Sequence, residues 1–250
     1  MLTRTNFQGV WNIVRFNWHQ YFILFVVALL LLIWGAMSSG MLQLIIYVLV
    51  LLSFAQVLVT LLVSYYVYDL SGLYELKQVG DLNCLKVLNI SAGFDETSDI
   101  LKQQFPDIIL QKADFYDPLQ HTEISIKRAR KAYPSSQDTL IVKTEELPFA
   151  EASFDKVICI FSAHEIRNVN ERIAFLKELA RVCDARGEII IMEHLRDVPN
   201  FLAYNIGFMH FYPKSNWETC FATAGLKVTE ELKTTKFVSI FKLKPNGTPN

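Results

Sequence analysis

The feature that most constrains the fold of this chain is a long stretch without formal charge. Between Arg15 and Asp69 there are 53 consecutive residues, and none of them is Asp, Glu, Lys or Arg. All 25 acidic residues lie beyond it, and only two of the 24 basic residues precede it. A single soluble domain does not separate its charges in this way. The sequence therefore predicts a membrane segment joined to a soluble domain. The net charge of −1 argues against a strongly basic nucleic-acid-binding protein.

Two apolar runs fill the uncharged stretch, 21–37 and 41–68, with a three-residue polar break between them. A helix of about 20 apolar residues spans a bilayer core. A break this short favours a helical hairpin, because unpaired backbone is not tolerated in lipid. We therefore predict a transmembrane hairpin over 21–68 that contacts the lipid bilayer. A cleaved signal peptide and a buried hairpin of a soluble protein are the alternatives. The second apolar run and the length of the uncharged stretch argue against them.

The charges before the hairpin predict its orientation. Arg4 and Arg15 precede it without any acidic residue, which places residues 1–20 in the cytoplasm as a flanking segment. After a hairpin the chain returns to the same side, so the soluble domain is predicted to be cytoplasmic in a protein integral to an inner or plasma membrane. The four cysteines show no paired spacing, which is typical of a reducing compartment. The hairpin could also pair two copies of the chain in a homo-oligomer.

Beyond an amphipathic linker at 69–83, the pattern alternates between strands and helices, which predicts an α/β domain over 84–245 and a tail at 246–250. Strands buried on both faces between helices indicate a parallel sheet covered on both sides. The predicted helices are 97–104, 122–132 and a third that is capped by Asn170 and closed by Gly187. The predicted strands are 86–90, 108–112, 139–142, 154–161 and 188–192, followed by a terminal pair at 226–232 and 236–243.

The carboxyl ends of parallel strands form the edge where such sheets bind ligands. Gly93 follows the first strand and permits a tight turn. Asp114 follows the second strand, 21 residues after Gly93, which is the spacing at which an acid reaches the ribose hydroxyls of an adenosine ligand. A nicotinamide cofactor is not indicated, because the turn lacks the Gly-x-Gly-x-x-Gly pattern.

The passage Leu147–Asp155 contains an LPF…SFD pattern that leads into the fourth strand. Together with the turn Val87–Gly93 and the acid after the second strand, it resembles the class I S-adenosylmethionine-dependent methyltransferases of the type 11 subgroup. The resemblance covers roughly residues 84–192. It implies a Rossmann-like, seven-stranded sheet with an antiparallel seventh strand, and S-adenosylmethionine as the cofactor. The positions it implies for cofactor binding are Asn89, Ser91, Gly93, Asp114, Thr144, Glu145 and Ser162.

The sequence departs from the family pattern at two places. The first motif of the family reads acid-x-Gly-x-Gly-x-Gly, whereas Asn89, Ser91, Gly93 and Asp95 occupy those positions here. The usual Gly-Asp-Ala before the LPF passage is replaced by Val-Lys-Thr at 142–144. Two acids that normally contact the cofactor are therefore absent, and the implied cofactor site depends on the architecture, on Asp114 and on backbone groups.

Polar residues cluster after the fourth and fifth strands. His164, oriented by Glu165, is the first candidate for a catalytic base, and His194 is the second. A zinc-protease motif is excluded, because the sequence reads His-Glu-x-x-Asn and follows a strand. A metal site assembled from His164, His194 and His210 is disfavoured, and no metal is expected. The residues predicted to bind the acceptor are Arg167, Arg196, Tyr204, His210, Phe211 and Trp217.

The sequence therefore predicts a membrane-anchored methyltransferase that acts on a small-molecule or lipid-like acceptor. The alternative is a non-catalytic, membrane-tethered scaffold with a degenerate methyltransferase fold. A basic run at 127–131 is interpreted as the solvated face of a helix, with contact to anionic lipid headgroups as the sharper alternative.

Overall fold

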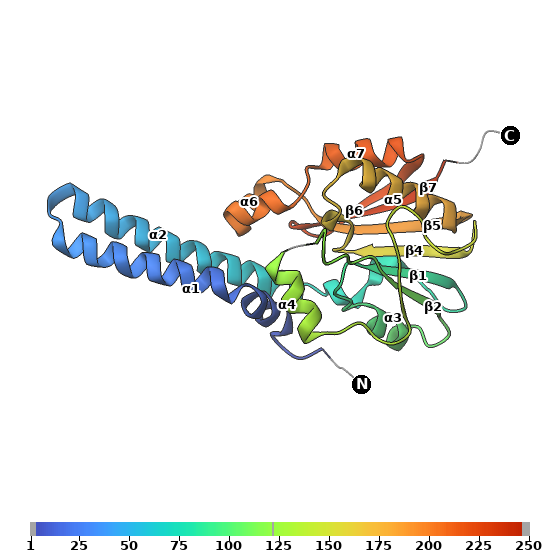
Figure 1. The fold of residues 1–250 in the computed structure, drawn as a ribbon, viewed down its shortest axis with the longest axis horizontal. Helices are drawn as coiled ribbons and strands as arrows, with labels where there is room; N and C mark the ends of the chain where they lie inside the picture. Colours follow the sequence, from blue (N-terminus) through green and yellow to red (C-terminus); the bar gives the residue numbers. More distant parts are fainter. Residues whose placement is uncertain (1–3, 122, 247–250) are drawn as a thin grey trace.

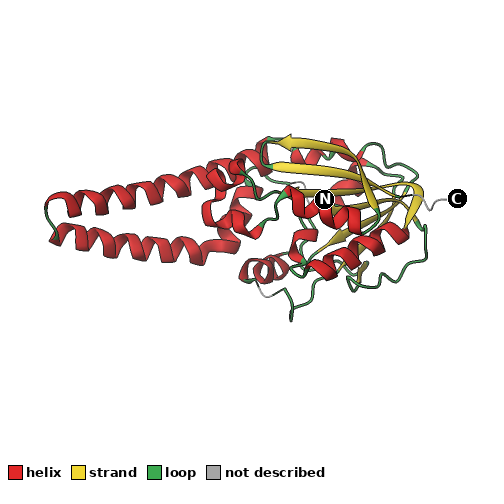
Figure 2. Cartoon of the chain, turned by 90° about the horizontal axis from the view of Figure 1, so that it is seen from above, coloured by secondary structure: helices red, strands yellow, loops and turns green. Residues whose placement is uncertain are grey.

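The computed structural model describes residues 4–121 and 123–246, and a long helical hairpin projects from an α/β domain (Figures 1 and 2). Of the predicted tail, only Asn246 lies within the described residues, and Thr122, the first residue of the second predicted helix, lies outside them. In Figure 1 the two hairpin helices run side by side, and their connection is the part most distant from the sheet.

The hairpin consists of α1 (Gln8–Met37) and α2 (Gly40–Tyr65), joined by two serines. The helices pack closely at Gly35, where a Cβ atom would lie 2.7 Å from the ring of Tyr47. In the described part of the chain, α1 and the helical stretch Gly40–Val79 are long and apolar enough to cross a membrane. One detail differs from the prediction: α1 begins within the segment 1–20, which is therefore mostly helix and not a separate flank.

The segment interpreted as an amphipathic linker is part of the folded domain. It forms three short helical turns, η1 (Tyr66–Leu70), η2 (Leu73–Glu75) and η3 (Lys77–Val79). The apolar residues of this segment are buried against one face of the sheet, together with side chains of β1, β4, β5 and β7. The apolar positions that predicted an amphipathic linker thus serve as core positions.

The sheet confirms the predicted Rossmann-like, seven-stranded architecture. Its order is β3-β2-β1-β4-β5-β7-β6, in which β1 to β5 run parallel and β7 pairs antiparallel with both β5 and β6. This order places the carboxyl ends of β1, β2 and β4 side by side, as the ligand edge requires. The strands are β1 (Lys86–Ser91), β2 (Ile109–Asp114), β3 (Thr139–Ile141), β4 (Phe154–Ile160), β5 (Cys183–His194), β6 (Leu226–Thr235) and β7 (Val238–Pro245).

Helices cover both faces of the sheet. The second core cluster, on the opposite face from the linker segment, contains Phe175 and Leu179 of α5 together with Trp217 and Phe221 of α7. The helices of the domain are α3 (Ser98–Gln104), α4 (Ile124–Ala132), α5 (Val169–Val182), α6 (Val198–Tyr204) and α7 (Lys214–Thr223).

Two local predictions about α5 were wrong. The N-cap is Asn168, whose side chain accepts hydrogen bonds from the backbone N–H groups of Asn170 and Glu171. The apolar pattern did not distinguish the two asparagines, because both lie before the same helical face. Gly187 does not close the helix. It lies inside β5, which begins directly after α5 at Cys183 and is much longer than the predicted strand.

Specific polar contacts fix the hairpin on the domain. Both carboxylate oxygens of Asp69 accept hydrogen bonds from backbone N–H groups at the start of α1, at 2.7 and 2.9 Å. In the C-terminal half of α2, Thr60 Oγ1 donates to the carbonyl oxygen of Ala203 at 2.7 Å, and Gln56 donates to the same end of α6. The polar residues of the apolar helix α2 therefore hold α6 against it.

Candidate active site

A cavity of about 230 Å³ lies where the hairpin meets the carboxyl edge of the sheet; we call it the central cavity. One wall comes from α1, with Asn12, Ile13 and Phe16. The opposite wall comes from the strand ends, with Phe161 after β4 and His194 at the end of β5. The hairpin and the sheet thus build this cavity together, although they are far apart in the sequence.

The turn after β1 has the geometry that the sequence predicted for Gly93. Its φ is +86°, in the region that favours glycine. A Cβ atom there would lie 2.9 Å from atoms of both Tyr116 and Arg130. Its backbone N–H donates to Asp114 Oδ1 at 2.7 Å, which joins the turn after β1 to the end of β2. The turn is therefore too tightly packed for any other residue.

Asp114 is fully buried, and four protein donors occupy its carboxylate. Oδ1 also accepts from the N–H of Tyr116 at 2.9 Å. Oδ2 accepts from Arg130 Nη1 at 2.5 Å and from Ser135 Oγ at 3.0 Å. The Arg130 guanidinium also lies over the Tyr116 ring, 4.4 Å from its centroid. In this conformation Arg130 and Ser135 occupy the oxygen that a ribose diol would need.

The other residues implied for the cofactor lie at the same edge, but several side chains are engaged in structure. Asn89 is buried and donates to side chains at the start of α3, among them Thr97 and Ser98. Ser162 donates to a backbone carbonyl of β1. Their hydroxyl and amide donors therefore hold loops in place.

Two further hollows adjoin these residues. Ser91 and Phe94 line a small hollow of about 70 Å³ between the ends of β1 and β4. Thr144 and Glu145 line a larger hollow of about 490 Å³ beyond β2 and β3, in which the Thr144 hydroxyl donates to Glu171. The edge therefore offers the glycine turn, the acid and the hollows that a nucleoside cofactor requires. The Arg130 guanidinium and the Ser135 hydroxyl occupy the carboxylate oxygen that the ribose of such a cofactor would need.

His194 is a neutral, oriented imidazole. Its Nδ1 lies 2.8 Å from the carbonyl oxygen of Phe237, so Nδ1 carries the proton and Nε2 accepts the hydrogen bond from the Tyr68 hydroxyl at 2.7 Å. The rings of Phe161 and Phe211 stack against it, with centroids 5.1 and 4.9 Å away. Burial between them lowers the pKa of His194 to about 4. His194 is thus an unprotonated base at neutral pH.

His164, the first candidate for the base, is in a different electrostatic environment. Its Nδ1 lies 2.6 Å from the buried carboxylate of Glu193, and its Nε2 lies 3.2 Å from Glu165. Burial opposes the charge of the imidazole, but the two carboxylates outweigh burial and raise the pKa of His164 to about 10. The same contacts keep the pKa of Glu165 low despite its burial. A cationic imidazole between two acids cannot accept a proton, which favours His194 as the base.

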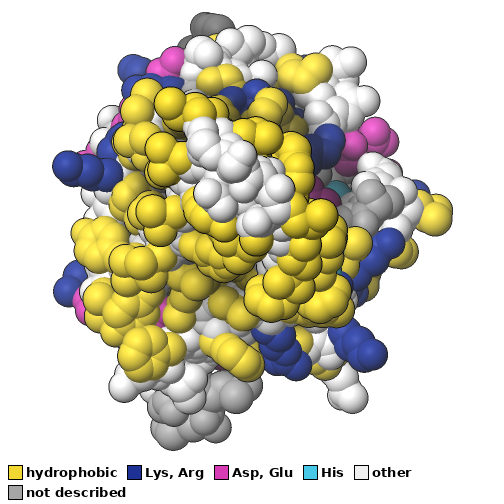
Figure 3. Space-filling model, turned by 90° about the vertical axis from the view of Figure 1, so that its left-hand side faces the viewer, with side chains coloured by type: hydrophobic (Ala, Val, Ile, Leu, Met, Phe, Trp, Pro, Cys, Tyr) yellow, Lys and Arg dark blue, Asp and Glu magenta, His cyan; other side chains and the backbone are white. Residues whose placement is uncertain are grey.

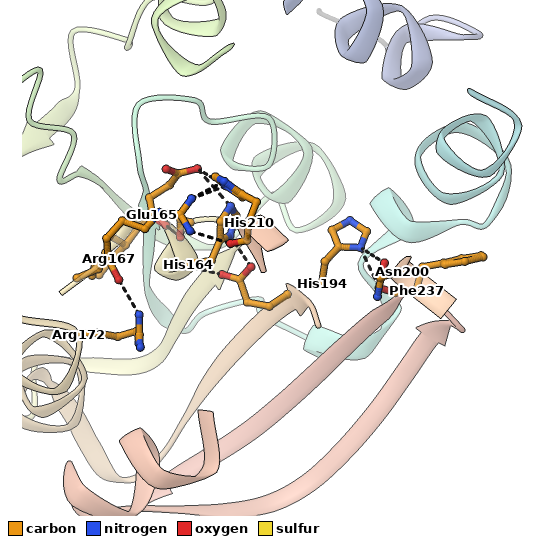
Figure 4. Close-up of polar contacts among 12 residues, drawn as sticks. His164, Glu165, Arg167, Arg172, His194, Asn200, His210 and Phe237 are labelled. Carbon is orange, nitrogen blue, oxygen red and sulfur yellow. Dashed lines mark hydrogen bonds and ion pairs between the residues drawn. The ribbon is translucent and has the colours of Figure 1, made fainter. Parts of the chain in front are cut away.

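The residues predicted to bind the acceptor lie in different parts of the structure. Tyr204, His210 and Phe211 line a second cavity of about 330 Å³, which lies between the hairpin and the domain; we call it the hairpin-side cavity. Arg167 contacts His210 at the rim of this cavity, and Figure 4 shows both beside Glu165 and His164. Arg196 is engaged in structure, since its guanidinium donates to carbonyl oxygens of Met209 and Phe211.

Trp217 does not fit the predicted role. It is fully buried in the core, where it stacks on Phe221 of the same helix, α7. The indole therefore faces the sheet and contributes to the packing of α7, not to a cavity. An aromatic residue on an amphipathic helix gives the same sequence pattern in either role.

Sequence reasoning missed four residues of the site. Tyr68 falls within the predicted transmembrane segment, Glu193 within the predicted polar cluster after the fifth strand, and Phe16 within the predicted flank, and none of them was singled out. Arg130 was interpreted as part of a solvated helix face, as was its neighbour Arg128. Arg128 instead donates to the carbonyl oxygen of Phe16. The strand-end position of Glu193 could have identified it, whereas nothing local indicates that Tyr68 or Arg130 reaches the sheet edge.

Comparisons with known proteins agree with this geometry. Residues 93–191 match the model of a family described as a methyltransferase domain. A demethylmenaquinone methyltransferase of Thermotoga maritima is 27% identical over 135 residues, which cover 54% of each chain. A ubiquinone/menaquinone biosynthesis C-methyltransferase of Geotalea daltonii is 34% identical over 86 residues, which cover 34% of each chain. The chain spans about half the length, or less, of these two curated relatives.

Among solved structures, a SAM-dependent methyltransferase from Aquifex aeolicus superposes with a TM-score of 0.52 at 16% identity, over 71% of this chain and 94% of that one. At this identity the likeness concerns the fold alone. Together, the family match and this superposition give residues 93–191 the sequence pattern and the fold of a methyltransferase domain.

Proposed function

We propose that this chain is a membrane-bound enzyme that transfers a methyl group from S-adenosylmethionine to a lipid-like acceptor taken from the bilayer. The observation that carries the proposal is the composite wall of the central cavity. Asn12 and Phe16 of α1 and Tyr68 of η1 line it together with His194. A hairpin that served only as an anchor would not need to form part of a site at the sheet edge.

The surface of the hairpin supports its place in a bilayer. Large apolar side chains point away from the protein, with Leu30 61% and Leu51 67% exposed. Seen from the hairpin end, hydrophobic side chains cover much of the face and most basic side chains lie toward its periphery (Figure 3). A bilayer would remove this apolar surface from water, which stabilises by roughly 25 cal/mol per Å². Both ends of the chain and the catalytic domain then lie on the cytoplasmic side, with 21–68 in contact with lipid.

Two adjoining cavities lie between the hairpin and the base. The hairpin-side cavity shares Ile13, Tyr68 and Phe211 with the central cavity, and it extends to Tyr21 and Thr60 on the apolar parts of α1 and α2. An apolar acceptor could therefore move from the bilayer to the sheet edge without crossing water.

An exposed apolar surface lies beside the mouth of this path. It belongs to α6 and the turn that follows, where Leu202 is 62% and Ile206 is 79% exposed. Because Gln56 and Thr60 of α2 hold α6 in place, this surface continues the apolar surface of the hairpin. It is suited to the bilayer interface, which would position the mouth at the level of the acceptor.

The sheet edge provides the groups for the cofactor. The turn at Gly93 lets the backbone approach a ligand closely, and Asp114 would accept hydrogen bonds from ribose hydroxyls once Arg130 moves aside. When bound, S-adenosylmethionine supplies an electrophilic methyl group. The residues of this chain then have to align the acceptor, exclude water and remove a proton, and alignment alone can contribute several kcal/mol.

His194 is placed to take the proton of the acceptor. Its Nε2 accepts the Tyr68 hydroxyl, and an acceptor hydroxyl at that position would donate its proton to the same nitrogen. The loss of that proton increases the electron density of the atom to be methylated. The aromatic rings on both sides of His194 exclude water and keep the imidazole neutral. General base catalysis of this kind contributes about 10²–10⁴-fold.

The chemistry of the path and of the base favours a phenol-like acceptor with an apolar tail. The two curated relatives are named for quinone substrates, and a reduced quinone has these two features. We therefore propose that the acceptor belongs to this class.

A second candidate function is the non-catalytic scaffold. Asp114 and the changed glycine motif favour it, because protein donors saturate the carboxylate that would hold the cofactor.

The first experiment measures binding of S-adenosylmethionine to the full chain in nanodiscs by calorimetry and by thermal shift. A ligand present at 100 times its Kd stabilises a protein by about 2.7 kcal/mol. Absence of binding would favour the scaffold. Labelled cofactor is then offered with a membrane extract or with the aqueous fraction of the same cells. Methylation confined to the aqueous fraction would contradict the lipid route.

A blocking variant tests the path directly. Gly207 lines the hairpin-side cavity, and the nearest atom to an added Cβ is the Tyr204 Cβ at 3.6 Å, so the first atom of a side chain there meets no clash. Gly207→Phe should raise the KM for the extracted acceptor at least tenfold and leave the Kd of the cofactor unchanged. An unchanged KM would place the entry route elsewhere.

A further inference from the structure

We propose that His164, Glu165 and His210 bind a divalent transition-metal ion, for which Zn²⁺ is the probe. The proposal goes beyond methyl transfer and does not depend on it. His164 and Glu165 belong to the single turn Ala163–Glu165 that follows β4, whereas His210 comes from the segment that follows α6. Figure 4 shows the three side chains converging from these two segments.

The spacing of the donor atoms matches a metal site. Nε2 of His164 lies 3.2 Å from Glu165 Oε1, and Nε2 of His210 lies 3.4 Å from the same oxygen. One donor atom from each of the three residues lies within 4.8 Å of the others. Bonds of about 2.0–2.2 Å in a tetrahedral site place neighbouring donors about 3.3–3.5 Å apart. Both donor distances from Glu165 therefore match a tetrahedral site, and the two imidazole nitrogens lie within 4.8 Å of each other.

Both imidazoles are oriented by a carboxylate at the other ring nitrogen. Nδ1 of His164 lies 2.6 Å from Glu193, and Nδ1 of His210 lies 2.8 Å from Glu123, although Arg167 Nη2 also contacts this Nδ1. Carboxylate–histidine pairs of this kind fix the ring and its tautomer in metal sites, with the far nitrogen as the ligand. In both pairs the carboxylate holds Nδ1, and Nε2 faces Glu165. An ordinary ion-pair network does not require this repeated arrangement.

The charges also suit a divalent cation. Glu123, Glu165 and Glu193 bring three negative charges, which face the Arg167 guanidinium and, without an ion, the His164 imidazolium. Arg167 Nη2 lies 2.8 Å from His210 Nε2, so its guanidinium competes with an ion for that nitrogen. Its side chain is 41% exposed and can turn to solvent. Two imidazoles with one carboxylate, and positions left for water or a ligand, are typical of zinc and iron(II) sites.

The test measures Zn²⁺ affinity of the untagged full chain in detergent, without cofactor or acceptor, by competition with a chromophoric chelator. Cobalt(II) absorption reports the ligand geometry in parallel. We expect one equivalent of Zn²⁺ and a loss of affinity of at least tenfold in both His210→Ala and Glu165→Gln. Glu123→Gln, which leaves all three ligands, should weaken binding by about tenfold. Arg167→Met should tighten it severalfold, because it removes the competing cation.

His19→Ala is the matched control, because His19 lies beside Arg128 and outside the cluster. The Zn²⁺ affinity of this variant should equal that of the parent chain. Thermal unfolding identifies any variant that fails to fold. If His210→Ala does not fold, the Zn²⁺ affinities of Glu165→Gln and Glu123→Gln test the proposal. Absence of saturable binding at one equivalent would overturn the proposal. Equal affinity in His210→Ala and His19→Ala would overturn it as well. Because no methyl transfer is measured, neither result depends on the proposed activity.

Discussion

Arg130→Met should change the affinity for S-adenosylmethionine and the stability of the free protein in opposite directions. Arg130 Nη1 lies 2.5 Å from Oδ2 of Asp114, whose side chain is 1% exposed, whereas that of Arg130 is 29% exposed. A cofactor whose ribose uses this carboxylate has to displace the guanidinium. The Asp114–Arg130 contact therefore acts as an internal competitor of the cofactor.

The magnitude follows from the type of contact. A hydrogen bond between charged groups contributes about 1.5–3 kcal/mol. If the cofactor no longer has to break it, the Kd of S-adenosylmethionine should fall by roughly 10- to 150-fold. The free protein should lose about 1–3 kcal/mol, because Asp114 stays buried with only Gly93, Tyr116 and Ser135 as donors.

Calorimetric titration gives the Kd, and thermal unfolding without ligand gives the stability. Arg128→Met is the matched control: it removes a cation from the same helix, but Arg128 donates to Phe16 of α1 and not to Asp114. The control should leave the Kd unchanged. An unchanged or higher Kd in Arg130→Met would refute the competition. If neither the parent chain nor either variant binds S-adenosylmethionine, the proposed methyltransferase activity would be refuted.

Three further predictions concern the base and the membrane segment. His194→Gln should lower turnover by about 10²–10³-fold with the cofactor Kd unchanged, since the base is lost and the sheet edge is not; equal turnover would exclude His194 as the base. Because burial lowers the pKa of His194 to about 4, the unfolded chain binds a proton near pH 6.5 that the folded chain does not. Stability should therefore fall by up to about 3 kcal/mol as the pH drops from 6.5 to 4, and this part of the pH dependence should be absent in His194→Gln. A reporter that is active only outside the cytoplasm should stay silent at both termini and respond near Ser39, whereas a response at the C-terminus would contradict the topology.

The sequence by itself determined the architecture, because periodicity is a local property. The uncharged stretch between Arg15 and Asp69 predicted two long apolar helices, and buried strands between helices predicted the parallel sheet. The tight turn at Gly93 and the acid at Asp114 could be located for the same reason, since a strand end is a position in the sequence. Such patterns do not fix boundaries: Asn168 and Asn170 precede the same apolar face, and only the backbone geometry selects the cap.

Only the tertiary structure decided which groups share an environment, and environment determines chemistry. His164 and His194 have the same pKa in an unfolded chain, and both lie at strand ends, His164 just after β4 and His194 as the last residue of β5. In the folded protein His164 lies between Glu165 and Glu193 and is cationic, whereas His194 lies between two aromatic rings and is neutral.

Long-range packing likewise placed Tyr68 beside His194 and Arg130 on Asp114. The first contact joins the end of the hairpin to β5, and the second joins α4 to β2. Neither partner carries a local signal of the other, because the contact depends on how the hairpin and α4 pack on the sheet edge. The sequence could therefore predict a methyltransferase sheet next to a membrane, but the folded chain alone decides that the two build one site.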